Sequence, residues 1–118
     1  MKVKRIVANI EARDIPAARR FYHDVLGLDP IMDHGWIVTY GSGEQARAQI
    51  SFATQGGAGT PVPDLSIEVD DLDAALAGVE RAGFPIEYGP ADEEWGVRRF
   101  FVRDPFGKLV NILVHKGA

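Results

Sequence analysis

The sequence lacks several features that would identify a class of protein at once. It has no cysteine among 118 residues, which excludes disulfides, thiolate metal sites and a cysteine nucleophile. It has no run of lysine and arginine, and its formal net charge of -4 argues against a nucleic-acid partner. No segment is apolar over the roughly 20 residues that a membrane span requires. The first residues also lack the apolar stretch of a signal peptide. We therefore expect no nucleic-acid or membrane partner and a cytoplasmic location.

What the chain does have is an internal near-repeat. Residues 10–18 read IEARDIPAA and residues 67–75 read IEVDDLDAA. Each copy ends a strand-like segment, passes through an aspartate and enters a helical pattern. A repeat of about half the chain indicates two copies of one supersecondary unit rather than a solenoid. The identical positions are Ile10, Glu11, Asp14, Ala17 and Ala18, which match Ile67, Glu68, Asp71, Ala74 and Ala75.

The first copy predicts one helix among three strands. Alternating residues predict a strand over 4–11, Asp14 is the expected helix cap, and Gly27 is the expected helix end. Further strands are expected over 36–40 and 47–53. The Gly- and Pro-containing stretch 56–63 is the expected linker, so that the first module covers about 1–55.

The second copy, about 64–118, repeats this order. A strand over 64–70 precedes a helix that begins after Asp71 and ends at Gly83. Strands are then expected over 85–88, 97–103 and 109–115, with a turn at 104–107. The predicted fold is a single α+β domain, 1–118. It consists of two βαβββ modules whose curved mixed sheets pair to form a concave cleft, with the helices outside.

The strands have one apolar and one mostly polar face. In the strand over 64–70, Leu65, Ile67 and Val69 face the helix, so Asp64, Ser66 and Glu68 point the other way. Polar faces often meet only water. Because the duplication turns two such faces toward a shared space, we expect them to line a ligand cleft.

Four segments carry a resemblance to a known family. They are 9–14 (NIEARD), 21–28 (FYHDVLGL), 65–71 (LSIEVDD) and 104–112 (DPFGKLVNI). Together they resemble the vicinal oxygen chelate superfamily, which includes glyoxalases, bleomycin-resistance proteins and extradiol dioxygenases. The resemblance covers essentially the whole chain. It implies the paired βαβββ fold and a homodimer, but it does not by itself define a function.

Enzymes of that superfamily hold a divalent metal on the concave strands. At the corresponding positions this sequence has Val7, Gln49, Asp64 and Asn111. Valine cannot bind a metal, and one carboxylate with two amides is a poor ligand set for Zn, Ni or Fe. We therefore expect no metal and no other cofactor. The histidines, at 23, 34 and 115, are expected to lie on the surface, although the segment His34-Gly35-Trp36 is expected near the cleft mouth.

Aromatic and charged side chains suggest what the cleft holds. Trp36 and Trp95 fall in or beside loops that flank it, where they are suited to stacking on a flat ligand. Arg98 and Arg99 alternate along one strand, so one of them points into the cleft, and alternation leaves open which. Acidic residues suit a basic ligand. They are Asp64, Glu68, Glu93 and Glu94.

The sequence favours a metal-independent protein that binds a small aromatic or basic molecule. The alternative is an enzyme of the same superfamily, with an unusual metal site or with Glu68 or Asp64 as acid or base. A non-catalytic accessory protein that uses its dimer surface is a third possibility, which no residue selects. The predicted ligand-binding residues are Val7, Asn9, Trp36, Gln49, Ser51, Asp64, Ser66, Glu68, Trp95, Phe101, Asn111 and Leu113.

Overall fold

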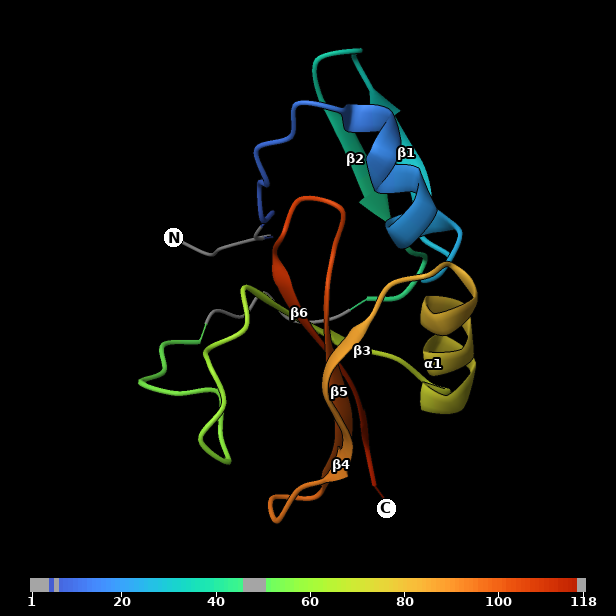
Figure 1. Cartoon of the computed structure of the whole chain (residues 1–118). Coiled ribbons are helices and arrows are strands. Elements are labelled where there is room, and N and C mark those ends of the chain that lie inside the picture. Colours follow the sequence, from blue (N-terminus) through green and yellow to red (C-terminus); the bar gives the residue numbers. More distant parts are fainter. Residues whose placement is uncertain (1–4, 6, 46–50, 117–118) are drawn as a thin grey trace.

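The structure, a computed structural model, describes residues 5, 7–45 and 51–116. It confirms the predicted α+β class and has two sheets, β1-β2 and β3-β6-β5-β4. In Figure 1 the hairpin and the short helices of the first half lie above the larger sheet. The elements in chain order are η1 (Ile15–Ala17), η2 (Arg19–His23), β1 (Asp29–Asp33), β2 (Val38–Gly41), β3 (Leu65–Glu68), α1 (Leu72–Arg81), β4 (Ile86–Asp92), β5 (Val97–Arg103) and β6 (Leu109–His115).

The second half has the predicted βαβββ order. Strand β3 runs parallel to β6, whereas β5 is antiparallel to both β6 and β4, so the sheet is mixed. The observed bounds of β5 and β6 equal the predicted ranges 97–103 and 109–115, and β4 extends four residues beyond the predicted 85–88. One face of this sheet packs against α1 through buried apolar side chains, which are Leu72, Ala75, Val79, Phe100, Val102, Val110 and Ile112.

The ends of α1 follow the sequence signals. The Asp71 carboxylate accepts a 3.0 Å hydrogen bond from the Ala74 N–H, and Gly83 follows the helix with a φ of +84°. Because that bond satisfies a free N–H of the first turn, Asp71→Ala is expected to lower the free energy of unfolding by about 1 kcal/mol in a urea titration. Asp70→Ala removes an equally exposed neighbouring carboxylate and is the control. Equal losses for the two variants would contradict a capping role.

The first half departs from its predicted helix. Instead of one α-helix it forms the short η1 and the π-helical η2, and Asp14 makes no side-chain cap. The wider turn is closed by bonds such as Asp24 N–H to Arg19 O, at 2.9 Å. It places the adjacent Phe21 and Tyr22 both in the core, as a regular helical stripe would also do. The expected end at Gly27, whose φ is +73°, is present.

The strands of the first half also differ from the prediction. The described residues of the expected strand 4–11 form no strand, because no neighbouring strand pairs with them, and they border a cavity instead. For the expected strand 47–53, residues 46–50 lie outside the described residues and 51–53 form no strand. The predicted strand 36–40 is present as β2. Its partner β1 was not predicted, because all five of its residues are exposed and give no alternating pattern.

A buried hydrogen bond joins the two halves. The Tyr22 hydroxyl donates to the Asp104 carboxylate at 2.7 Å, and Asp104 stands in the turn between β5 and β6. The same carboxylate accepts the N–H groups of Phe106 and Lys108, at 2.8 and 2.9 Å. The Tyr22–Asp104 bond thus fixes η2, and the hairpin that follows it, against the larger sheet.

Among the described residues, no helix is long and apolar enough to cross a membrane.

Candidate functional site

A large cavity lies between the two halves of the molecule. It has a volume of about 840 Å³ and is bordered by the N-terminal segment, the β1–β2 hairpin and the edge strand β3. We call it the N-terminal cavity. Its wall is mostly apolar, and the charged residues among the described part of its lining are Arg5 and Glu11. The apolar side chains that matter here are Val7, Ile10, Trp36, Ile37, Leu65 and Ile67.

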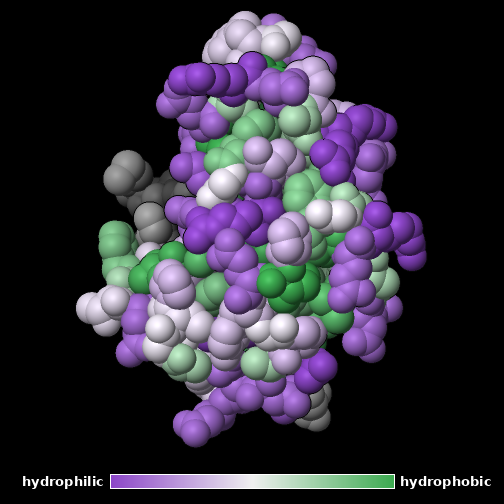
Figure 2. All heavy atoms as spheres, in the orientation of Figure 1, coloured by the Kyte–Doolittle hydropathy of each residue, from purple (hydrophilic) through white to green (hydrophobic). Residues whose placement is uncertain are grey.

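Trp36 is the most unusual residue of this cavity. Its side chain lines the wall, yet the residue is 78% exposed. It follows a tight turn in which the Gly35 N–H donates to the Asp33 carboxylate at 2.8 Å. Figure 2 shows apolar surface interrupting the polar surface across the middle of one face of the molecule. An exposed indole at a cavity wall offers a flat apolar surface for stacking.

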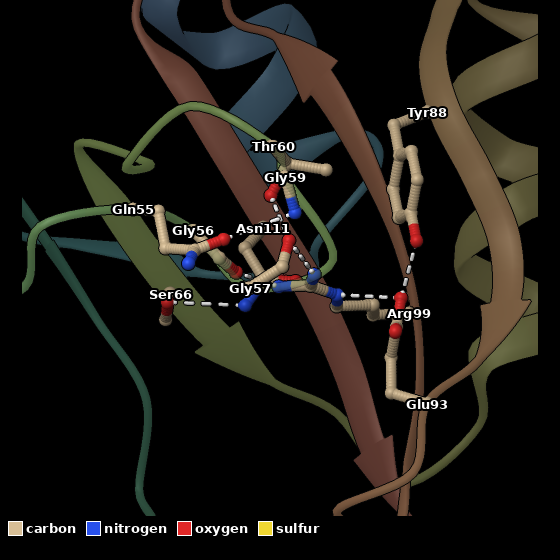
Figure 3. Close-up of polar contacts among 10 residues, drawn as sticks. All are labelled: Gln55, Gly56, Gly57, Gly59, Thr60, Ser66, Tyr88, Glu93, Arg99 and Asn111. Carbon is tan, nitrogen blue, oxygen red and sulfur yellow. Dashed lines mark hydrogen bonds and ion pairs between the residues drawn. The ribbon is translucent and has the colours of Figure 1, made fainter.

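A second group of predicted residues lies on the face of the larger sheet opposite α1. Phe101 on β5 stands opposite Asn111 on β6, and Ser66 on β3 stands on the other side of Asn111. The Asn111 amide N–H donates to the Ser66 hydroxyl at 3.1 Å. Figure 3 shows Ser66 and Asn111 beside residues 55–60, which we call the strap.

Arg99 is the arginine that points toward this face. Its Nε donates to the Glu93 carboxylate at 3.2 Å, and the two side chains are 4% and 6% exposed. Its guanidinium carbon lies 5.4, 5.0 and 4.8 Å from the ring centres of Tyr88, Trp95 and Phe101. The Tyr88 hydroxyl also donates to Glu93, and this bond, together with burial, raises the pKa of Tyr88.

Arg98 points the other way. It pairs with the exposed Asp92 at 3.3 Å, and Arg98 and Lys116 together lower the pKa of the Asp92 carboxyl. The alternation along β5 therefore separates a buried arginine with fixed partners from a solvated one. Only the buried arginine can contribute to a site on the sheet face.

The positions that hold a metal in the resembling enzymes do not fit one here. Val7 has no donor atom, and the Asp64 carboxylate accepts the Leu109 N–H at 2.8 Å. Gln49 lies outside the described residues. Asn111 offers a single carbonyl oxygen. Within the described ranges, no three His, Cys, Asp or Glu side chains gather as a metal site. Lone oxygen donors of this kind are a weak set for a catalytic transition metal.

The structure thus divides the predicted site residues. Val7, Asn9 and Trp36 border the N-terminal cavity, whereas Ser66, Phe101 and Asn111 share the sheet face with Trp95 nearby. Glu68 pairs with His115 at 2.7 Å, with both side chains exposed, and the half-buried Leu113 lies beside it. Ser51 lies exposed outside any strand.

Sequence reasoning missed other residues of these sites. Leu65 and Ile67 were predicted to face the helix and do pack against the core, but they also reach the N-terminal cavity because β3 is an edge strand. The carbonyl groups of Gly56 and Gly57 contact Arg99. The pattern of side chains in a sequence does not indicate contacts made by backbone atoms. Only the glycine content of the linker suggested that its backbone contacts another residue.

The sequence and the fold were compared with known proteins. The sequence profile of the Glyoxalase/Bleomycin resistance protein/Dioxygenase superfamily matches residues 4–112. No curated protein matches the sequence. Among solved structures, TioX from Micromonospora sp. ML1 is 22% identical, covers 98% of each chain and gives a TM-score of 0.66.

Two further solved structures show the same fold. TnmS3, an antibiotic binding protein from Streptomyces sp. CB03234, is 19% identical over 91% of each chain, with a TM-score of 0.66. A lactoylglutathione lyase from Agrobacterium tumefaciens is 21% identical over 87% of this chain and 86% of that chain, with a TM-score of 0.61. At these identities the likeness concerns the fold alone.

Proposed function

Because the chain belongs to the Glyoxalase/Bleomycin resistance protein/Dioxygenase superfamily, we propose that it binds a small flat aromatic molecule, neutral or basic, without a metal. The ligand lies in the N-terminal cavity and stacks on Trp36. The observation that carries this proposal is a mostly apolar cavity of about 840 Å³ with an exposed indole in its wall. Ligand sites for drug-sized molecules typically have about 300–1,000 Å³ and a few polar groups.

The polar groups of the cavity indicate which ligands it favours. Glu11 offers a carboxylate to a basic substituent, and the Asn9 amide offers both a donor and an acceptor. Arg5 is the opposing charge of the wall. The net charge of -4 adds a general attraction for cations. TnmS3, an antibiotic binding protein, has the same fold, so the proposed binding role is compatible with this fold.

The enzyme alternative has weaker support. Asp64 uses its carboxylate to hold the Leu109 N–H, and Glu68 pairs with His115 away from the N-terminal cavity. Neither carboxylate therefore lines the N-terminal cavity, in which the proposed ligand lies. The likeness to a lactoylglutathione lyase extends to the fold, but the metal positions of this chain do not fit a catalytic metal.

We also propose that the protein is a homodimer, as the resemblance implied. The exposed apolar side chains Met32, Phe52 and Val62, which do not line the N-terminal cavity, support this, because such surface is commonly buried between subunits. Sedimentation equilibrium would give a dimer mass at micromolar concentration. A monomer mass across the concentration range would overturn the proposal.

Trp36→Ala is expected to weaken binding of proflavine, a flat tricyclic cation, by about tenfold, because the variant loses the stacking surface. Isothermal titration calorimetry measures this. Phe52→Ala is the matched control, since Phe52 is 89% exposed and does not line the cavity. Binding to the wild-type protein is expected to be unchanged after treatment with a chelator. If the wild-type protein binds neither proflavine nor a neutral flat analogue, the proposed function is contradicted.

A further inference from the structure

The strap is held on the sheet face by Arg99. The Nη1 group donates to the Gly56 carbonyl at 2.7 Å and Nη2 donates to the Gly57 carbonyl at 3.2 Å. In Figure 3 the strap crosses the face on which Asn111 and Arg99 stand. The helix α1 covers the opposite face (Figure 1). The strap therefore covers a surface that would otherwise be open to a ligand.

The two carbonyl oxygens occupy the places that a carboxylate would take. An arginine binds a carboxylate through two parallel N–H bonds, one oxygen on each nitrogen. Gly56 and Gly57 supply one neutral oxygen to each terminal nitrogen of Arg99. Charge-assisted bonds are stronger than bonds to neutral carbonyls. A ligand carboxylate therefore bonds the two Nη groups more strongly than the strap carbonyls do, beside the Nε group that donates to Glu93.

The strap is held together by its own hydrogen bonds. Its internal bonds include Gly56 N–H to Thr60 O at 2.7 Å and Gly59 N–H to the Gln55 side chain at 3.0 Å. In the part of the chain that the structure describes, its hydrogen bonds to the sheet are the two from Arg99. Displacing the strap thus exchanges these two bonds and leaves its own bonds intact.

Asn111 provides an independent sign of a missing partner. Asn111 is 8% exposed, and its buried Oδ1 atom has no hydrogen-bond partner among residues 5, 7–45 and 51–116. Asn111 stands opposite Phe101, two residues along β5 from Arg99, so the two polar side chains share the face. Leaving a buried acceptor unpaired is unfavourable. A ligand N–H or O–H group would satisfy it.

We propose that the sheet face under the strap is a second binding site, for an aromatic carboxylate that carries a hydroxyl or amino group. The carboxylate displaces the Gly56 and Gly57 carbonyls from Arg99. The aromatic ring contacts the rings that already surround the guanidinium, those of Trp95 and Phe101. The hydroxyl or amino group donates to the Asn111 Oδ1 atom. This site is distinct from the N-terminal cavity and takes a ligand of opposite charge.

The glycines of the strap give a sharp test. A Cβ on Gly57 would lie 2.7 Å from the Trp95 ring, so in Gly57→Ala the strap or this ring must shift, which weakens the packing of the strap on the sheet. Gly59 has a similar backbone, with φ of +76° against +88°, but a Cβ there meets nothing within 4 Å. Gly59→Ala therefore introduces the same backbone strain without the collision, and it is the matched control.

The probe is 6-hydroxy-2-naphthoate, compared with its neutral primary amide by isothermal titration calorimetry. The carboxylate is expected to bind about tenfold more tightly than the amide. Only the carboxylate can accept two charge-assisted hydrogen bonds from the Arg99 guanidinium. Gly57→Ala is expected to bind the carboxylate several-fold more tightly than Gly59→Ala. Arg99→Lys is expected to lose the preference for the carboxylate, whereas Arg98→Met, on the other face of the strand, keeps it.

Trp95 and Trp36 separate this site from the proposed function. Binding under the strap is expected to shift the indole N–H signal of Trp95 in a nuclear magnetic resonance spectrum and leave that of Trp36 in place. Equal affinity for acid and amide, equal affinity of the two alanine variants, or a response confined to Trp36 would overturn the proposal. So would the absence of carboxylate binding by both the wild type and Gly57→Ala. None of these results bears on proflavine in the N-terminal cavity.

Discussion

Replacing Asp104 by alanine is expected to lower the free energy of unfolding by about 3–4 kcal/mol. The carboxylate is 5% exposed and accepts three hydrogen bonds, from the Tyr22 hydroxyl and from the N–H groups of Phe106 and Lys108. Alanine leaves the buried Tyr22 hydroxyl and the two half-buried N–H groups without their acceptor, and a fully buried unsatisfied group is unfavourable by about 1–3 kcal/mol. A urea titration measures the loss.

Tyr22→Phe removes one of these bonds and is expected to lower the free energy of unfolding by about 1–2 kcal/mol. Tyr40→Phe, on the half-buried tyrosine of β2, is the control. If Asp104→Ala changes stability by no more than the Tyr40 control, the bond between the two halves has no energetic role.

The same bond predicts a dependence on alkaline pH. Burial, followed by the bond to Asp104, raises the pKa of Tyr22 above its ordinary value of 10.0. Folding therefore favours the protonated hydroxyl, and this stability is fully present below pH 10 and is lost as the pH rises further. Tyr22→Phe is expected to weaken this alkaline loss in melts taken between pH 8 and pH 11, with the Tyr40→Phe protein as reference.

Arg99→Leu is expected to lower the free energy of unfolding by about 3–5 kcal/mol, because it leaves the buried Glu93 carboxylate without its charged partner. Glu93 is 9% exposed and keeps only the Tyr88 hydroxyl among the partners described above. The variant also releases the strap carbonyls. Arg98→Leu is the control from the adjacent position, where the ion pair is exposed and contributes about 1 kcal/mol or less.

A double variant shows whether the loss of stability comes from losing the Arg99–Glu93 attraction or from leaving the Glu93 carboxylate buried without a charged partner. Arg99→Leu with Glu93→Leu removes both charges, and apolar replacement of a whole buried pair is often close to neutral. The double variant is therefore expected to be more stable than Arg99→Leu alone. A double variant less stable than the single one would contradict this interpretation.

The sequence predicted the second half well for a physical reason. Strands β5 and β6 each pair on both sides and bury one apolar face, so their alternation is strong and their bounds were predicted correctly. Strand β1 has no such pattern, since it pairs through its backbone while its side chains remain exposed. The π-helical turn was not predicted either, because side-chain spacing does not distinguish it from an α-helix over so few residues.

The candidate site was predictable in its aromatic residues and less so in its geometry. The segment His34-Gly35-Trp36 was expected near the cleft mouth, and the structure places Trp36 at a cavity wall. Alternation required either Arg98 or Arg99 to point inward, but only three-dimensional packing shows that Arg99 does. That Leu65 and Ile67 reach a cavity follows from the position of β3 at the sheet edge, which sequence alone does not give.

The central claim, that a flat ligand stacks on Trp36, has one direct measurement. The chain has two tryptophans, so a ¹⁵N-labelled sample gives two indole N–H signals, which Trp36→Phe and Trp95→Phe assign. With increasing proflavine the Trp36 signal is predicted to shift until it saturates, while the Trp95 signal stays in place. A shift of Trp95 alone, or of neither signal, would contradict binding in the N-terminal cavity.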